Sequence, residues 1–212
     1  MATSLQLVSQ FEIELSTANP FSFLIYPFQA NTLPFHYADN ELKFLVPYML
    51  PTDFSLPIIQ YAEALAHATN HDTLMFLGQL IQRISSEFAY EFREQGEPKS
   101  PSQVWAHQNG SCRDFANFCM DVCRHHGIAA RFVSGYFYSG KAEERHLHGW
   151  VEVYLPGGGW RGIDPTQGVW ADEHYIPLAT AANPTKVAPI CGSYRGNATQ
   201  TMFAEVTMQL LH

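Results

Sequence analysis

Three stretches of the chain repeat apolar residues at the spacing of an α-helix. The clearest predicts a helix from a cap at Asn70 or Asp72 to about Glu94. Its apolar face carries Leu74, Leu77, Ile81, Ile84 and Phe88. Two further helices are expected over 58–68 and 112–126, and in both the apolar residues again gather on one side.

After residue 127 the pattern changes to the alternation of half-buried strands. Strands are expected over 130–138 and 147–155, and the Pro-Gly-Gly-Gly turn at 156–159 predicts a hairpin into a strand over 160–164. Further strands are expected over 175–179 and 201–211. Helices followed by a run of neighbouring strands indicate an α+β domain with an antiparallel sheet.

The first fifty residues differ from the rest. Short alternating or apolar runs over 11–15 and 21–26 predict two strands, and the proline-rich segment 28–51 is interpreted as an extended arm. We therefore divide the chain into an N-terminal part, 1–50, and a main core, 51–212.

Composition narrows the class of protein. The chain has 212 residues, 46% of them apolar and 14% aromatic, which is enough to bury a sizeable core. A net charge of −8 argues against a nucleic-acid partner. No run of eighteen apolar residues predicts a membrane span, and residues 1–6 lack the features of a signal peptide. The four cysteines are too few and too clustered for a disulfide framework, so we expect thiols and a cytoplasmic location.

Cys112 is the candidate nucleophile among these cysteines. It follows the turn Asn109-Gly110-Ser111 and opens a predicted helix. Backbone N–H groups and the helix dipole at that position favour a thiolate and can stabilise an oxyanion. Cys119 and Cys123 lie four residues apart on the apolar face of the same helix, so we interpret them as packing residues.

A cysteine nucleophile requires a base and a group that orients the base. His148 begins an alternating strand, and Asp164 ends the strand expected to pair with it through the 156–159 turn. Adjacent strands can hold the two side chains together, near the N-terminus of the Cys112 helix. On spacing alone, a surface histidine and a turn aspartate remain the alternative interpretation.

Four segments resemble a known family. They are Gly-Ser-Cys-Arg-Asp-Phe-Ala at 110–116, Gly-Ile-Ala-Ala-Arg-Phe-Val-Ser-Gly-Tyr at 127–136, His-Gly-Trp-Val-Glu-Val-Tyr at 148–154 and Gly-Trp-Arg-Gly-Ile-Asp-Pro-Thr at 159–166. In order and spacing they are similar to the transglutaminase-like core, specifically to the bacterial branch described as transglutaminase-like cysteine proteases.

The resemblance implies a papain-like α+β core in which the nucleophile sits at a helix N-terminus packed on an antiparallel sheet. It implies that Cys112 is the nucleophile, His148 the general base and then acid, and Asp164 the orienting residue. Members of the family usually carry a β-rich domain before the core, to which only residues 1–27 could correspond here.

The resemblance leaves the reaction open between hydrolysis and amine transfer. We favour a cysteine-dependent hydrolase of peptide or other amide bonds, because animal-type transglutaminases depend on calcium and the chain has no EF-hand-like acidic run. The alternatives are a protein-glutamine amine transferase and a non-catalytic interaction module on the same fold. A peptide or protein substrate is the expected partner, and the oligomeric state is left open.

Several other residues near the predicted site are candidates for a role in it. Besides the Cys112 backbone, the oxyanion donor candidates in the segment before the nucleophile are Gln103, Trp105, His107 and Gln108. His146 competes with His148 only if the strand register slips. A zinc site from Cys119, Cys123, His125 and His126 is disfavoured because these side chains leave the helix in different directions. We expect neither a metal nor a cofactor.

Overall fold

The computed structural model describes residues 6–15, 19–93, 96–138, 147–188 and 206–209. Its helices are α1 (Asp39–Leu45), α2 (Leu56–Ala68), α3 (Thr73–Glu87), α4 (Pro101–His107) and α5 (Cys112–His125), with short 3-10 turns η1 (Phe28–Asn31), η2 (Val46–Tyr48) and η4 (Pro184–Val187). Its strands are β1 (Ala89–Tyr90), β2 (Asn109–Gly110), β3 (Ala130–Phe137), β4 (Leu147–Leu155), β5 (Gly159–Asp164), β6 (Val169–Trp170) and β7 (Tyr175–Ala181).

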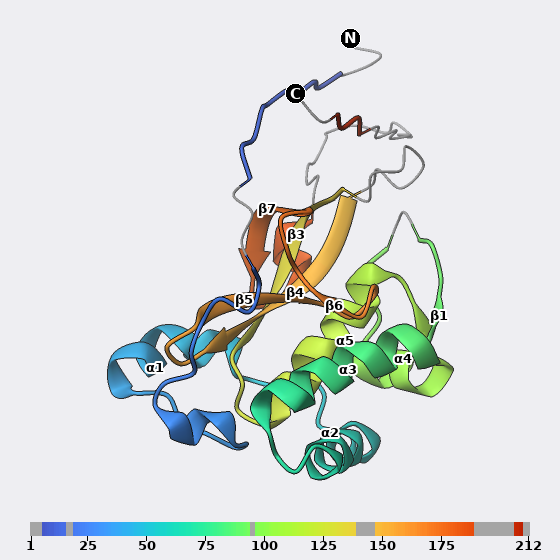
Figure 1. Ribbon diagram of the computed structural model, residues 1–212. Coiled ribbons are helices and arrows are strands. Elements are labelled where there is room, and N and C mark those ends of the chain that lie inside the picture. The colour runs from blue at the N-terminus through green and yellow to red at the C-terminus, as the bar shows by residue number, and fades with distance from the viewer. Residues whose placement is uncertain (1–5, 16–18, 94–95, 139–146, 189–205, 210–212) are drawn as a thin grey trace.

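Within the described residues, five strands form an antiparallel sheet in the order β6-β5-β4-β3-β7. The β4–β5 hairpin has the register expected from its turn, running from Leu155 opposite Gly159 to Val151 opposite Ile163. β1 and β2 make a separate small parallel pair. Figure 1 shows α3, α4 and α5 gathered on one side of this sheet, and α1 beside the β4–β5 hairpin. The predicted α+β class with an antiparallel sheet is confirmed.

The three predicted helices are present with small shifts at their ends. Asp72, not Asn70, caps α3, since its side chain accepts a hydrogen bond from the Met75 amide at 2.8 Å. The prediction that this helix reaches Glu94 is wrong, because Phe88 is already extended and the chain enters β1. The structure also contains a helix that the sequence pattern did not predict, α4, whose N-terminus is capped by Ser100.

The two strands expected within the first fifty residues do not form in the structure. Residues 11–15 are irregular and exposed, since none of the described strands pairs with them, and residues 21–26 form no strand. The segment 28–51 is not an extended arm, since it holds η1, α1 and η2. Five residues of this segment, and Ile25 just before it, are buried in the same core as the helices. The five are Ala30, Leu33, Phe35, Tyr37 and Leu45. The division at residue 50 stays a prediction.

The strand expected over 201–211 falls mostly outside the described residues, and its described part, 206–209, is irregular. The other C-terminal strand, β7, is longer than expected and ends at Ala181. β7 bears directly on the candidate site because its first residue, Tyr175, is buried against the sheet.

The side chains on the two faces of β4 pack into different hydrophobic clusters. Val151, Val153 and Leu155 join the main core beneath the helices. Trp150 points to the opposite face and packs with Val133 and Tyr175. The alternation thus places His148, which shares the parity of Trp150, next to this second cluster.

Candidate active site

Cys112 is the first residue of α5, and local contacts determine that the helix begins there. The Asp114 carboxylate accepts hydrogen bonds from the Ser111 amide at 2.8 Å and from the Ser111 hydroxyl at 2.9 Å. A side chain at Gly110 would place its Cβ 2.7 Å from that of Asp114, so the turn before Cys112 requires glycine. The result is a partly exposed thiol at a helix N-terminus.

His148 and Asp164 are brought together by the β4–β5 hairpin. Nε2 of His148 donates to Oδ2 of Asp164 at 2.7 Å. The Asp164 side chain is fully buried and that of His148 is 11% exposed. The predicted pairing of these two residues across the hairpin is therefore present in the structure.

Cys112 lies beside His148, and the interaction of the two side chains raises the pKa of the imidazole. Because Nε2 is taken by Asp164, Nδ1 is the ring nitrogen left to face the sulfur. Gly149 permits this approach: a Cβ there would lie 2.7 Å from Cζ of Phe132 and 3.7 Å from Cα of Arg113. The structure thus joins the three residues singled out in the sequence into one chain of contacts, Cys112 to His148 to Asp164.

The charges around His148 favour the protonated form of its imidazole. Burial opposes protonation of His148, but the Asp164 charge and hydrogen bond, together with Cys112, outweigh it and raise the pKa of His148 to about 10. Burial likewise acts against the Asp164 anion, but His148, Tyr175 and the Thr166 amide hold the pKa of Asp164 below its usual value. His148 is therefore protonated and Asp164 ionised at neutral pH.

Asp164 has further donors that sequence reasoning missed. The Tyr175 hydroxyl donates to Oδ2 at 2.8 Å. The amides of Thr166 and Gln167 donate to Oδ1 at 2.8 and 3.4 Å. The amide contacts follow from the Asp-Pro-Thr turn, whereas no local pattern marks Tyr175 as a partner of Asp164.

Tyr90 is a second residue near the site that the sequence did not reveal. β1 and β2 place it opposite Gly110, two residues before Cys112. Burial and the charges of Cys112 and Asp164 raise the pKa of Tyr90 to about 12, although its side chain remains half exposed. Tyr90 consequently forms part of the surface around the thiol.

The remaining sequence candidates have other roles or lie elsewhere. Cys119 and Cys123 are fully buried, as expected for packing residues, and burial raises the pKa of Cys119. The rings of His125 and His126 contact the carbonyls of Asp53 and Ala62, so the four residues of the zinc alternative do not converge. His146 lies outside the described residues.

The candidate oxyanion donors upstream of Cys112 belong to α4 and its C-terminal end. Gln103 accepts from the Ser100 amide at the start of α4, Trp105 stacks on Phe118, and the His107 ring contacts the Gln103 carbonyl. Gln108 ends α4 in a left-handed conformation.

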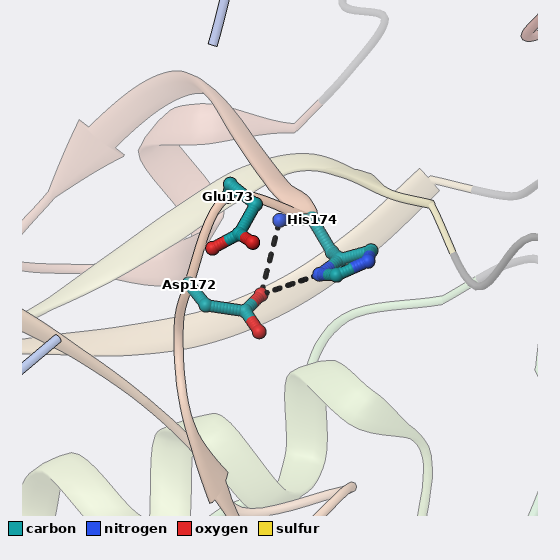
Figure 2. Close-up of side chains that lie close together, drawn as sticks. All are labelled: Asp172, Glu173 and His174. Carbon is teal, nitrogen blue, oxygen red and sulfur yellow. Dashed lines mark hydrogen bonds and ion pairs between the residues drawn. The ribbon is translucent and has the colours of Figure 1, made fainter. Parts of the chain in front are cut away.

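Among the described residues, one group of neighbouring donors is close enough to share an ion. Figure 2 shows it: Asp172, Glu173 and His174, with ligand atoms within 4.8 Å of one another. Both the amide and Nδ1 of His174 contact Oδ1 of Asp172, at 3.0 and 2.9 Å. These contacts within three consecutive residues shape the turn before β7, and we assign no metal to it.

The family of the chain follows from comparison with known proteins. The model of the transglutaminase-like superfamily matches residues 59–165, which is half of the chain and includes all three residues of the candidate site. The chain belongs to the transglutaminase-like superfamily.

Relatives of the chain are considerably longer. An uncharacterized protein of Mycobacterium leprae is 39% identical over 93 residues, covering 41% of this chain and 33% of the relative. The Bacillus subtilis protein YebA is 29% identical over 149 residues, covering 61% of this chain and 20% of YebA. The matched part of this chain therefore spans at most a third of these relatives.

Solved structures confirm the fold. A Cytophaga hutchinsonii protein named as a candidate cysteine protease superposes with a TM-score of 0.61 at 20% identity, covering 78% of this chain and 55% of that one. The periplasmic domain of TgpA from Pseudomonas aeruginosa gives a TM-score of 0.48 at 26% identity, covering 62% and 49%. The superposition on the Cytophaga hutchinsonii protein confirms the predicted transglutaminase-core fold. In the described part of the chain, no helix combines the length and apolarity needed to cross a bilayer; the cytoplasmic location stays a prediction.

Proposed function

We propose that the chain is a cysteine-dependent hydrolase that cleaves peptide or other amide bonds through a thioester acyl-enzyme. The observation that carries this proposal is the continuous chain of contacts from Cys112 through His148 to the buried Asp164. A nucleophile, a base and an orienting carboxylate within contact distance are the elements that acyl transfer requires.

The proposed reaction begins with the Cys112 thiolate beside protonated His148. The sulfur attacks the amide carbon, and the carbonyl electrons move onto oxygen to give a tetrahedral oxyanion. As the oxyanion collapses, the C–N bond breaks and Nδ1 of His148 gives its proton to the leaving amine. A water molecule, deprotonated by His148, then attacks the thioester, and the carboxylic acid leaves as the thiolate re-forms.

The backbone of α5 supplies a donor for the oxyanion. The amides of Asp114 and Phe115 already bond the Ser111 carbonyl, whereas the Cys112 amide is the first of the helix and lies beside its own sulfur. An N–H at that place favours negative charge on the substrate oxygen. We propose the Cys112 amide as one oxyanion donor.

The partial exposure of Cys112 lets water reach the thioester, as hydrolysis requires, and amine transfer is the alternative. The test incubates the protein with a panel of peptide and amide substrates, including a glutamine peptide with a labelled amine. Ammonia release without amine incorporation indicates hydrolysis, and incorporation indicates transfer.

Iodoacetamide labelling followed by peptide mass spectrometry tests whether there is an activated thiol at all. Cys119 and Cys123 in the same molecule serve as internal controls because both are fully buried. We expect Cys112 to react first near neutral pH, and Cys112→Ala to abolish turnover. A Cys112 that reacts no faster than the buried pair, together with no turnover on any substrate, would favour the non-catalytic module.

A further inference from the structure

Two side chains donate to the same oxygen of Asp164. His148 Nε2 and the Tyr175 hydroxyl lie 2.7 and 2.8 Å from Oδ2, while the other oxygen accepts backbone amides at the turn that follows β5. A buried carboxylate with donors on both oxygens cannot rotate without breaking hydrogen bonds. The direction in which Asp164 holds the imidazole is therefore fixed by more than the His148 contact itself.

Tyr175 is itself held firmly. Its side chain is 6% exposed, and its ring packs 4.7 Å from that of Phe137 and 5.3 Å from that of Trp150. Gly135 makes room for this packing, because a Cβ there would come within 2.6 Å of the Trp150 ring and 2.1 Å of the Ile176 carbonyl oxygen. The hydroxyl thus reaches Asp164 from a rigid platform on β7, the strand at one edge of the sheet.

We infer that Tyr175 is a positioning residue of the proposed site, whose hydroxyl fixes Asp164 so that Asp164 orients His148 toward Cys112. The inference rests on the proposed function and adds a residue from a third strand to it. The phenol stays protonated, because burial and the Asp164 charge raise the pKa of Tyr175 far above its usual range. Its bond also helps to hold the pKa of Asp164 down.

Tyr175→Phe keeps the packed ring and removes only the hydroxyl group, so it tests the hydrogen bond to Asp164 without removing the packing. The titratable groups coupled to Asp164 or Tyr175 are His148 on β4, Asp172 before β7, Cys119 on α5 and Tyr90 on β1. Cys112 acts on His148 and Tyr90. None of these changes in Tyr175→Phe, so any altered titration reports the lost hydrogen bond.

The experiment measures the rate of Cys112 alkylation by iodoacetamide from about pH 4 to about pH 10 in the wild type and in Tyr175→Phe. Tyr154→Phe is the matched control, because the Tyr154 hydroxyl also donates to a carboxylate, Glu41, at 2.8 Å on the same sheet but away from the thiol. The imidazole N–H proton of His148 is followed by NMR in all three proteins.

Tyr175→Phe should raise the lower pH limit of alkylation by about one to two pH units, because Asp164 loses a hydrogen bond that holds its pKa down. The His148 N–H resonance should move or broaden. Tyr154→Phe should change neither. Identical profiles and resonances for Tyr175→Phe and wild type would overturn the positioning role while leaving the proposed function intact. An unreactive Cys112 in the wild type would overturn both the positioning role of Tyr175 and the proposed function.

Discussion

Nη2 of Arg93 lies 2.7 and 3.0 Å from the two carboxylate oxygens of Asp114, the fully buried third residue of the helix that carries Cys112. The same carboxylate accepts the Lys99 amide at 2.7 Å and both Ser111 donors. One buried charge therefore connects the chain before α4 to the turn that precedes Cys112, and the position of the thiol depends on contacts beyond the three residues of the candidate site.

This ion pair should contribute measurably to stability. Arg93→Met removes the cation but keeps most of the side-chain stem, and it should lower the free energy of unfolding in urea by about 1.5–3 kcal/mol because a hydrogen-bonded buried charge loses its partner. The control is Glu91→Gln, which removes a more exposed pair with Lys99. That change should cost at most about 1 kcal/mol. Equal losses of unfolding free energy in the two variants would contradict the prediction that the buried pair contributes more than the exposed one.

The Asp164 charge should govern the reactivity of the thiol. In Asp164→Asn the amide cannot stabilise the imidazolium, so the pKa of His148 should fall from its value of about 10. Turnover should drop by about two to four orders of magnitude, by analogy with the loss of the orienting carboxylate in other triads. Stopped assays on the substrate identified in the panel check the rate, and NMR titration of the ring checks the pKa. A variant with wild-type turnover would contradict the assigned role.

Because the pKa of His148 is raised in the folded state, we expect the stability of the protein to depend on pH. The folded-state pKa of His148 lies above the unfolded value of about 6.5, so its protonated form contributes stability that is fully present below that pH and is lost as pH rises toward about 10. Urea unfolding of wild type and His148→Gln between about pH 6 and about pH 10 should give curves that converge at the alkaline end. A constant difference between the two would show that the contribution does not come from this charge.

Gly149 should not tolerate a side chain. A Cβ there would lie 2.7 Å from the buried Phe132 ring, so Gly149→Ala should lower the free energy of unfolding by about 1–3 kcal/mol and move His148 relative to Cys112. Gly78→Ala in α3 is the control, because nothing lies within 4 Å of its Cβ position. It should stabilise the helix by about 0.5–1 kcal/mol. Urea unfolding measures both, and unchanged Cys112 alkylation in Gly149→Ala would contradict the geometric part of the prediction.

Much of the site could be predicted because its determinants are local. The start of α5 at Cys112 depends on Gly110, Ser111 and Asp114, all within four positions. His148 and Asp164 are 16 residues apart and are joined by a single hairpin whose glycine turn sets the register. Short loops and caps specify such pairings with little help from the rest of the chain.

The first fifty residues could not be predicted in the same way. The alternation over 11–15 is that of a strand, but a strand forms only where a partner completes its hydrogen bonds, and none of the described strands pairs with it. Prolines in 28–51 suggested an extended arm, yet apolar side chains such as Leu33 and Leu45 are buried against the helices. Tertiary burial there outweighed the local signals.

The sequence by itself determined where the three residues of the candidate site, Cys112, His148 and Asp164, lie, since turns, caps and strand alternation act over a few residues. Only the tertiary structure decided what surrounds them. Arg93 meets Asp114 across 21 positions, and Tyr175 meets Asp164 from a strand that is not its neighbour in the sheet. Contacts of this kind depend on how separate elements pack, and no local pattern in the chain encodes them.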